Sequence, residues 1–146
     1  MKCGQQTTVL RSRVGRRRFS IGALFAIAAI SQPAFAGSYL NRAALLVRQA
    51  TQEATYLRNR LSDRELARVV QKLAQGRLRA AREMLVPKEV AQAHPHLLLM
   101  LEKFERAAAA AAEREHIRFL TLERDAIDEE QIFRGILRQL GWPLPD

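Results

Sequence analysis

The sequence predicts an all-α fold, most simply an up-and-down four-helix bundle, behind a cleavable N-terminal signal peptide. Residues 38–140 contain only two glycines and are rich in Leu, Ala, Arg and Glu. Apolar residues recur there at spacings of three and four, which is the period of an amphipathic helix. No stretch shows the alternation of apolar and polar residues that is typical of a strand. A helical-hairpin array is the alternative architecture, although no repeat period is visible.

Two amphipathic segments occupy the first half of the domain. The first is expected from Ser38 to about Arg60. The second is expected to begin at Ser62, because Ser62 and Glu65 fit a capping box, and to end before Pro87. The apolar seam of the first segment consists of Leu40, Ala43, Val47, Ala50, Ala54, Leu57 and Leu61. The apolar face of the second consists of Leu66, Val69, Val70, Leu73, Leu78, Ala81 and Met84.

Two further segments follow a short helical turn at 87–94. The third helix is expected to have His94 as its cap and Pro95 as its first residue. A continuous helix over residues 97–140 would be about 65 Å long, so we expect a turn near Glu113–His116 to separate the third helix from the fourth. The fourth ends at Gly141, and a short extended tail follows, with Trp142 packed back on the bundle. The expected apolar residues are Leu97, Leu98, Leu101, Phe104, Ala108 and Ala111 in the third helix, and Phe119, Leu122, Ala126, Phe133, Ile136 and Leu140 in the fourth.

The first 36 residues have the three parts of a secretory signal: a basic n-region, an apolar run at 21–30 and a small-residue cleavage pattern. Ala34 and Ala36 form that pattern, so we expect cleavage after Ala36 to leave residues 37–146 as a single domain. The apolar run has about 10 residues, whereas a membrane-spanning helix needs about 20. An uncleaved N-terminal anchor is therefore the weaker alternative.

The n-region indicates the export route. Arg16 and Arg17, followed by Phe19, resemble a twin-arginine signal, which directs folded cargo across the membrane. Ser20 stands where such signals usually have Leu, and Gly15 where they usually have Ser or Thr. The general secretory route is therefore the alternative. Both routes predict a periplasmic or secreted bacterial protein.

The charge of the chain is concentrated in the signal. Six of the 24 basic residues and none of the 15 acidic ones lie within residues 1–36, so the net charge of +9 falls to +3 for the remainder. A domain of this charge, outside the cytoplasm and without aromatic residues among its arginines, predicts no nucleic-acid partner. The only cysteine, Cys3, lies in the signal. The domain therefore has no disulfide, and packing alone must stabilise it.

A basic stripe is the candidate binding surface. Eight basic and two acidic residues lie between Arg58 and Arg82. Spacings of four and seven place a subset on one helix face, namely Arg64, Arg68, Lys72 and Arg79. We expect this stripe to contact an unknown protein or an anionic component of the cell envelope. The alternative is neutralisation by the acidic segment 102–130, either within the bundle or in a homo-oligomer.

A transition-metal site is the second hypothesis, from a different functional class. Glu113-x-x-His116 has the spacing that di-iron bundle proteins use, although they carry the motif twice. Glu123 and Glu130 lie near the apolar arc of the fourth helix and could complete the site with ligands from neighbouring helices. The simpler interpretation pairs these two glutamates with arginines of the second helix, and Glu130 also has Arg134 four residues later, a favourable spacing for an ion pair.

Catalytic motifs and cofactor-binding motifs find no support in the sequence. No nucleophile elbow, no domain cysteine and no glycine-rich phosphate loop is present. A non-enzymatic protein without a cofactor is therefore expected.

Overall fold

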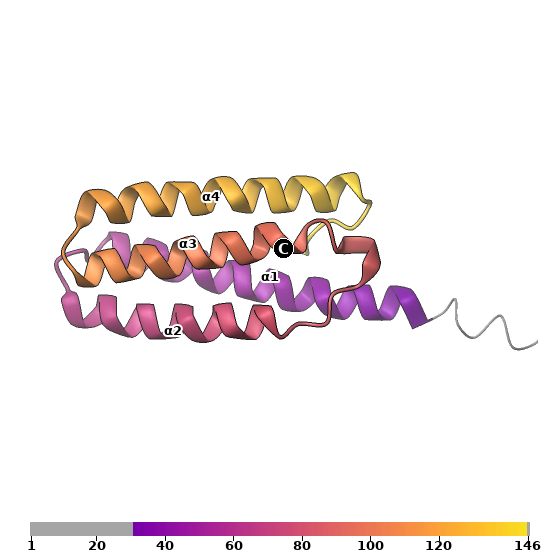
Figure 1. Ribbon diagram of the computed structural model, residues 1–146, viewed down its shortest axis with the longest axis horizontal. Helices are drawn as coiled ribbons and strands as arrows, with labels where there is room; N and C mark the ends of the chain where they lie inside the picture. Colours follow the sequence, from indigo (N-terminus) through magenta and orange to yellow (C-terminus); the bar gives the residue numbers. More distant parts are fainter. Residues whose placement is uncertain (1–30, 146) are drawn as a thin grey trace, which may run out of the picture.

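The protein was analysed as a computed structural model, which describes residues 31–145. Within this range the chain forms helices α1 (Ser31–Arg58), α2 (Arg64–Arg82), α3 (His94–Ala112) and α4 (His116–Gln139), with the short 3₁₀ helix η2 (Lys88–Val90) before α3. The helices lie side by side in an elongated bundle, and each runs opposite to the one before it (Figure 1). The expected all-helical bundle is thus confirmed for these residues. Arg16, Arg17 and Phe19 lie outside them.

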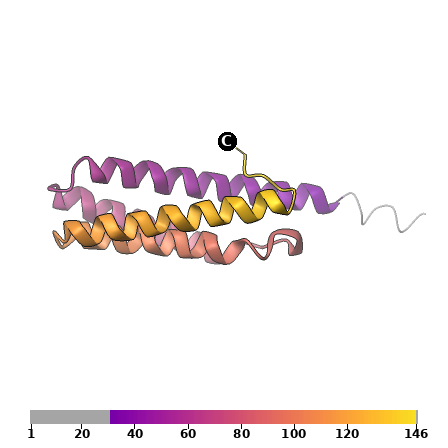
Figure 2. The ribbon, with the colours of Figure 1, turned by 90° about the horizontal axis from the view of Figure 1, so that it is seen from above.

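The connections divide between the two ends of the bundle. The α1–α2 and α3–α4 turns lie at one end, and the longer α2–α3 connection lies at the other, together with the C-terminal tail (Figure 1). Helix α3 packs most closely against α2 and α4. Helix α1 packs less closely and extends beyond the other helices at the second end (Figure 2). No helix within residues 31–145 is long and apolar enough to cross a bilayer.

Two apolar clusters fill the bundle along its length. The larger is centred on Leu97, Met100, Phe133 and Leu137, and the smaller surrounds Leu57 with Phe119 and the alanines of α3. The expected seam of α1 is buried from Leu40 to Leu57. The run Ala107–Ala112 is almost wholly buried, which allows the backbone of α3 to approach its neighbours closely. Trp142 packs on the larger cluster, as the sequence predicted.

The predicted apolar face of α2 was too broad. Val70, Leu78 and Ala81 are buried as expected, but Val69 and Leu73 are 55% and 52% exposed. Small residues set the buried face instead, because Ala67 and Ala74 bring α2 close to its neighbours. A helix buries a stripe on one side only. Apolar residues spread over more than this arc must therefore leave some side chains in water.

Helix starts differ from the predictions by one to several residues. Asp63, not Ser62, caps α2: its carboxylate Oδ1 accepts a hydrogen bond of 2.9 Å from the Leu66 amide. The residue before α3 is Ala93, so His94 and Pro95 form its first turn. Helix α1 begins, in the described part, at Ser31 rather than Ser38. It therefore includes Ala36, the last residue of the expected signal.

Two helices end in the same hydrogen-bonded motif. After α4, the Trp142 amide donates to the Leu137 carbonyl at 2.9 Å, and Gly141 adopts a left-handed φ of 79°. After α3, the Glu115 amide donates to the Ala110 carbonyl at 2.8 Å, and Arg114 has a φ of 64°. Both are Schellman caps, which need a left-handed residue just past the helix. The expected turn at Glu113–His116 is confirmed, with an arginine where glycine is the usual residue.

Candidate functional site

The basic stripe of α2 lies on the outside of the bundle, with Arg64, Arg68, Lys72 and Arg79 all exposed. Its N-terminal members have partners nearby. The Nε of Arg64 donates to the carbonyl of Ala112, the last residue of α3, at 3.0 Å. Arg68 pairs with Glu65 one turn before it, at 2.7 Å. For Lys72 and Arg79 the structure gives no ion pair with any residue of 31–145. Arg64 keeps its charge, but its guanidinium is held at the end of α3, so the unpaired cations that are not held by another residue lie at the centre and in the C-terminal half of the stripe.

The acidic residues of α3 and α4 do not neutralise this stripe by direct contact. Glu129 pairs with His96 and Lys103, and Glu130 pairs with Arg134. No ion pair within the described residues joins a stripe cation to an acid of α3 or α4. The stripe is therefore exposed and without a direct acidic contact from α3 or α4, although Arg79 lines a surface pocket that Glu102 and Glu105 of α3 also line.

Exposed apolar side chains lie next to the stripe. Val69 and Leu73 are four residues apart and so share a face, and each follows a stripe cation directly in sequence. Gly76 and Ala80 continue this line along the helix at spacings of three and four. The outer surface of α2 thus has two parallel strips, one basic and one apolar. The apolar strip was not predicted from the sequence, because Val69 and Leu73 were expected in the core.

The buried carboxylate of α4 has its partner on α1. Glu123 is buried, and its Oε2 accepts from Nε of Arg58 at 2.8 Å and lies 2.6 Å from Nη2. The prediction that Glu123 lies within the apolar arc is confirmed, but the partner predicted from α2 was wrong. Helix α4 faces α1 along this edge, so the arginine at the end of α1 is the one within reach.

Glu130 lies two turns further along α4 and is also held by α1. Its Oε2 accepts from the Thr51 hydroxyl at 3.2 Å, and its Oε1 accepts from Nε of Arg134 at 2.8 Å. The predicted pairing of Glu130 with an α2 arginine was wrong, whereas its predicted pairing with Arg134 is confirmed. Together, Glu123 and Glu130 give α1 a polar attachment to α4.

The residues of the hypothetical metal site are not gathered in one place. Glu113 follows the end of α3 and His116 begins α4, and both are exposed. The left-handed Arg114 breaks the helix between them, so the spacing of three does not place them on one helix face. Glu123 is already held by Arg58. Among residues 31–145 no group of three His, Cys, Asp or Glu side chains could hold a metal ion.

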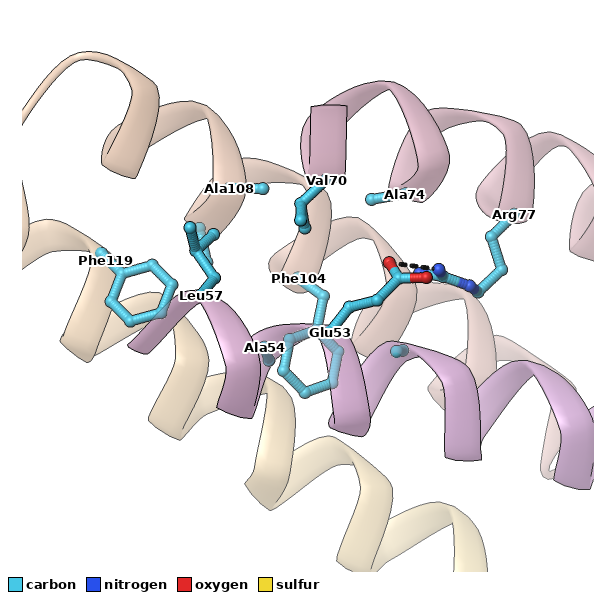
Figure 3. A pocket seen from close by; sticks show the side chains of 11 residues that line it. Glu53, Ala54, Leu57, Val70, Ala74, Arg77, Phe104, Ala108 and Phe119 are labelled. Carbon is cyan, nitrogen blue, oxygen red and sulfur yellow. Dashed lines mark ion pairs between the residues drawn. The ribbon is translucent and has the colours of Figure 1, made fainter. Parts of the chain in front are cut away.

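A second buried ion pair joins α1 to α2. Arg77, buried on α2, places Nη2 2.5 Å from Oε2 of Glu53 on α1 (Figure 3). That oxygen is buried and makes no well-aligned hydrogen bond, so the contact is close but poorly directed. The pair lies at a pocket of about 10 Å³ lined by Leu57, Val70 and Phe119, among others. This volume suits one water, whereas small-molecule sites need about 300 Å³.

The pair of Arg77 and Glu53 was not predicted from the sequence, although the position of Arg77 carries a signal for it. Arg77 is three residues after Ala74 and seven after Val70, which places it on the buried face of α2. A charged residue at such a position predicts a buried partner on the adjoining helix.

The histidines at the start of α3 have separate partners. Nδ1 of His94 is 3.1 Å from the Tyr39 hydroxyl of α1, and Nδ1 of His96 is 2.8 Å from Oε2 of Glu129. Burial lowers the pKa of His94 and raises that of Tyr39. The hydrogen bond from His96 lowers the pKa of Glu129, and Lys103 lowers it further. These contacts tie α3 to α1 and α4 and give the histidines structural positions.

Comparisons with known proteins add no relative. No protein-family profile matches the chain, and no curated protein or solved structure gives a significant match.

Proposed function

We propose that this chain is an exported, non-enzymatic helical-bundle protein that acts by contact with an anionic component of the cell envelope through the outer face of α2. The observation that carries the proposal is the exposure of Lys72 and Arg79 without an acidic partner in the described residues. Other exposed arginines without an ion pair in the described residues, such as Arg48 and Arg124, are dispersed over α1 and α4. Lys72 and Arg79, in contrast, lie on one face of a single helix.

The physical basis is electrostatic attraction to a surface of opposite sign. Cations near an anionic surface contribute about 1 kcal/mol each, and the attraction falls off within a Debye length of about 8 Å at physiological salt. A stripe of two to four cations supports weak, reversible and salt-sensitive association. Such contact needs no pocket and no catalytic group.

Export is tested at the signal. In the double variant Arg16→Lys/Arg17→Lys, a twin-arginine route predicts that the uncleaved precursor stays in the cytoplasm. The matched control is Arg11→Lys/Arg13→Lys, which should be exported as before. Mass spectrometry of the exported form should find Gly37 as its first residue. Export of the double variant at the normal rate would indicate the general secretory route, and a cytoplasmic wild-type chain would overturn the export proposal.

The contact is tested by charge removal on α2. We expect Lys72→Gln/Arg79→Gln to reduce sedimentation of the protein with isolated envelopes about 25-fold at low salt, since each cation is worth about fivefold. The matched control is Arg48→Gln/Arg124→Gln, which removes the same charge from exposed positions of α1 and α4. Equal loss in the two variants would show only a net-charge effect and would overturn the assignment of the α2 face.

A further inference from the structure

We propose that the anionic partner is a phospholipid bilayer surface, with Val69 and Leu73 entering the interface and Lys72 and Arg79 contacting the headgroups. This inference rests on the proposed function and names its partner. The proposed function uses only the basic strip of α2. The further inference uses the basic strip together with the adjacent apolar strip.

The apolar strip of α2 is exposed to solvent. Val69 and Leu73 are 55% and 52% exposed, while Ala67, Val70 and Ala74 face the core. Two branched apolar side chains one turn apart therefore stand in water on the outer side of the same helix. Contiguous exposed apolar surface is a feature of sites that dock on another molecule, whereas single exposed apolar side chains are ordinary.

The cations Lys72 and Arg79 lie beside the apolar strip. Lys72 lies between Val69 and Leu73 in sequence, and Arg79 lies on the same side as Lys72 one heptad later. Long basic side chains can extend to a phosphate layer while shorter apolar side chains enter the layer beneath it. The arrangement is that of an interfacial helix, which lies parallel to the membrane.

The two strips together favour lipid over a polyanionic glycan. A polyanionic glycan would satisfy Lys72 and Arg79 but would leave Val69 and Leu73 in water. A bilayer of anionic lipid offers phosphates and an apolar layer within one contact. An acidic protein surface is the other occupant that could satisfy both strips, and the experiment below separates it.

The experiment uses the full chain with vesicles of phosphatidylglycerol and, for comparison, of phosphatidylcholine. We expect sedimentation with the anionic vesicles only. Val69→Ser/Leu73→Ser should weaken binding about tenfold, and the loss should persist in 0.5 M salt (about 4 Å Debye length), where the charge contribution is largely screened. The matched control is Leu45→Ser/Ile132→Ser, whose residues are exposed on α1 and α4. Circular dichroism of each variant checks that the bundle is intact.

A second measurement locates the contact and separates it from binding by the basic n-region. Cys3 is the only cysteine, so a Cys3→Ser chain with Leu73→Cys carries an environment-sensitive dye at one place. We expect a blue shift of its emission with phosphatidylglycerol vesicles, and none from Leu99→Cys on α3. A blue shift at neither position, with binding lost in Arg16→Gln/Arg17→Gln/Arg18→Gln, would show that the n-region alone binds and would overturn the inference.

The outcomes distinguish the inference from the proposed function. If vesicles fail to bind but envelope proteins or glycans still require Lys72 and Arg79, the lipid assignment is overturned and the proposed function stands. If neither vesicles nor envelopes depend on Lys72 and Arg79, both are wrong. If vesicle binding depends equally on the α2 variants and on their controls, the α2 face is not the lipid contact.

Discussion

Arg58, at the end of α1, holds the buried carboxylate of Glu123 in the second turn of α4, with Nη2 2.6 Å from Oε2. The glutamate side chain is 4% exposed and the arginine 49%. The two residues are 65 apart in sequence. Their contact joins the least closely packed helix of the bundle to the last one.

Removal of Arg58 alone should therefore lower the free energy of unfolding more than removal of both Arg58 and Glu123. Arg58→Ala leaves a buried carboxylate without a partner, and we expect it to lower the free energy of unfolding by about 2 kcal/mol. This is below the range for a fully buried pair because Arg58 is half exposed. The double variant Arg58→Ala/Glu123→Leu should recover most of the loss. Urea unfolding measures both.

The control for this prediction is Arg68→Ala. Its pair with Glu65 is exposed on both sides, so we expect a change below about 1 kcal/mol. A double variant less stable than Arg58→Ala would contradict the argument.

The pH dependence of stability should show the environment of His94. Burial holds the pKa of His94 below its ordinary value of about 6.5. The unfolded chain then binds this proton more readily than the folded chain, so stability is lost as the pH falls below about 6.5. The variant His94→Asn keeps an acceptor for Tyr39. We expect the midpoint of its urea unfolding to change less between pH 7 and pH 5 than that of the wild type.

A control variant and the pH range of Glu129 separate the contribution of His94 from those of other groups. His116→Asn, at an exposed position, should leave the slope as in the wild type. The lowered pKa of Glu129 adds a further loss of stability only below about pH 4.3, the ordinary value for Glu. A slope between pH 7 and pH 5 that survives in His94→Asn would show that another group causes it.

The left-handed cap residue Arg114 should be a site of easy stabilisation. The left-handed conformation costs an L-residue with a side chain about 1–2 kcal/mol, whereas it costs glycine almost nothing. We expect Arg114→Gly to raise the free energy of unfolding by about 0.5–1 kcal/mol, after the greater freedom of glycine in the unfolded chain is counted. Thermal unfolding followed by circular dichroism measures it.

The same motif after α4 offers the reverse test. Gly141 has a φ of 79°, so Gly141→Ala should lower stability by about 1 kcal/mol. Opposite signs for the two variants support the shared cap geometry. Destabilisation by Arg114→Gly would instead mean that the arginine side chain makes a stabilising contact.

The start of α2 gives a prediction that separates two neighbouring residues. Asp63 accepts the hydrogen bond from the Leu66 amide, so Asp63→Ala should cost about 1 kcal/mol. Ser62→Ala should change stability by less than about 0.5 kcal/mol, because surface substitutions away from such contacts have small effects. Equal losses of stability in the two variants, measured by urea unfolding, would indicate that Ser62 also caps α2.

Helix count, helix order and most of the core could be predicted from sequence because they depend on local periodicity. The seam of α1 and the apolar positions of α3 follow spacings that a sequence displays directly. The register between neighbouring helices does not follow from such spacings. The buried face of α2 depends on which side brings Ala67 and Ala74 against other helices, and that choice turned Val69 and Leu73 outward.

The candidate sites show the same division. The basic stripe of α2 is a property of one helix and could be predicted. The partners of Glu123 and Arg77 depend on the distance between helices that are remote in sequence, so Arg58 and Glu53 could not be chosen from spacing alone. The turn at Arg114 separated Glu113 from His116, because a motif defined on a continuous helix loses its meaning where the helix ends.

The course of α1 has a consequence for the proposed cleavage after Ala36. In the described part this helix starts at Ser31, and Ala36 within it has no exposed surface. A protease that cuts after Ala36 needs that peptide bond unwound and accessible, which the packed helix does not offer without local opening. If the chain is cleaved after Ala36 as proposed, the cut must precede the docking of the first turns of α1 or wait for them to fray. Such a cut would leave the charged amino group of Gly37 at the positive end of the helix dipole, with Ser38 as the nearest residue able to cap the shortened helix.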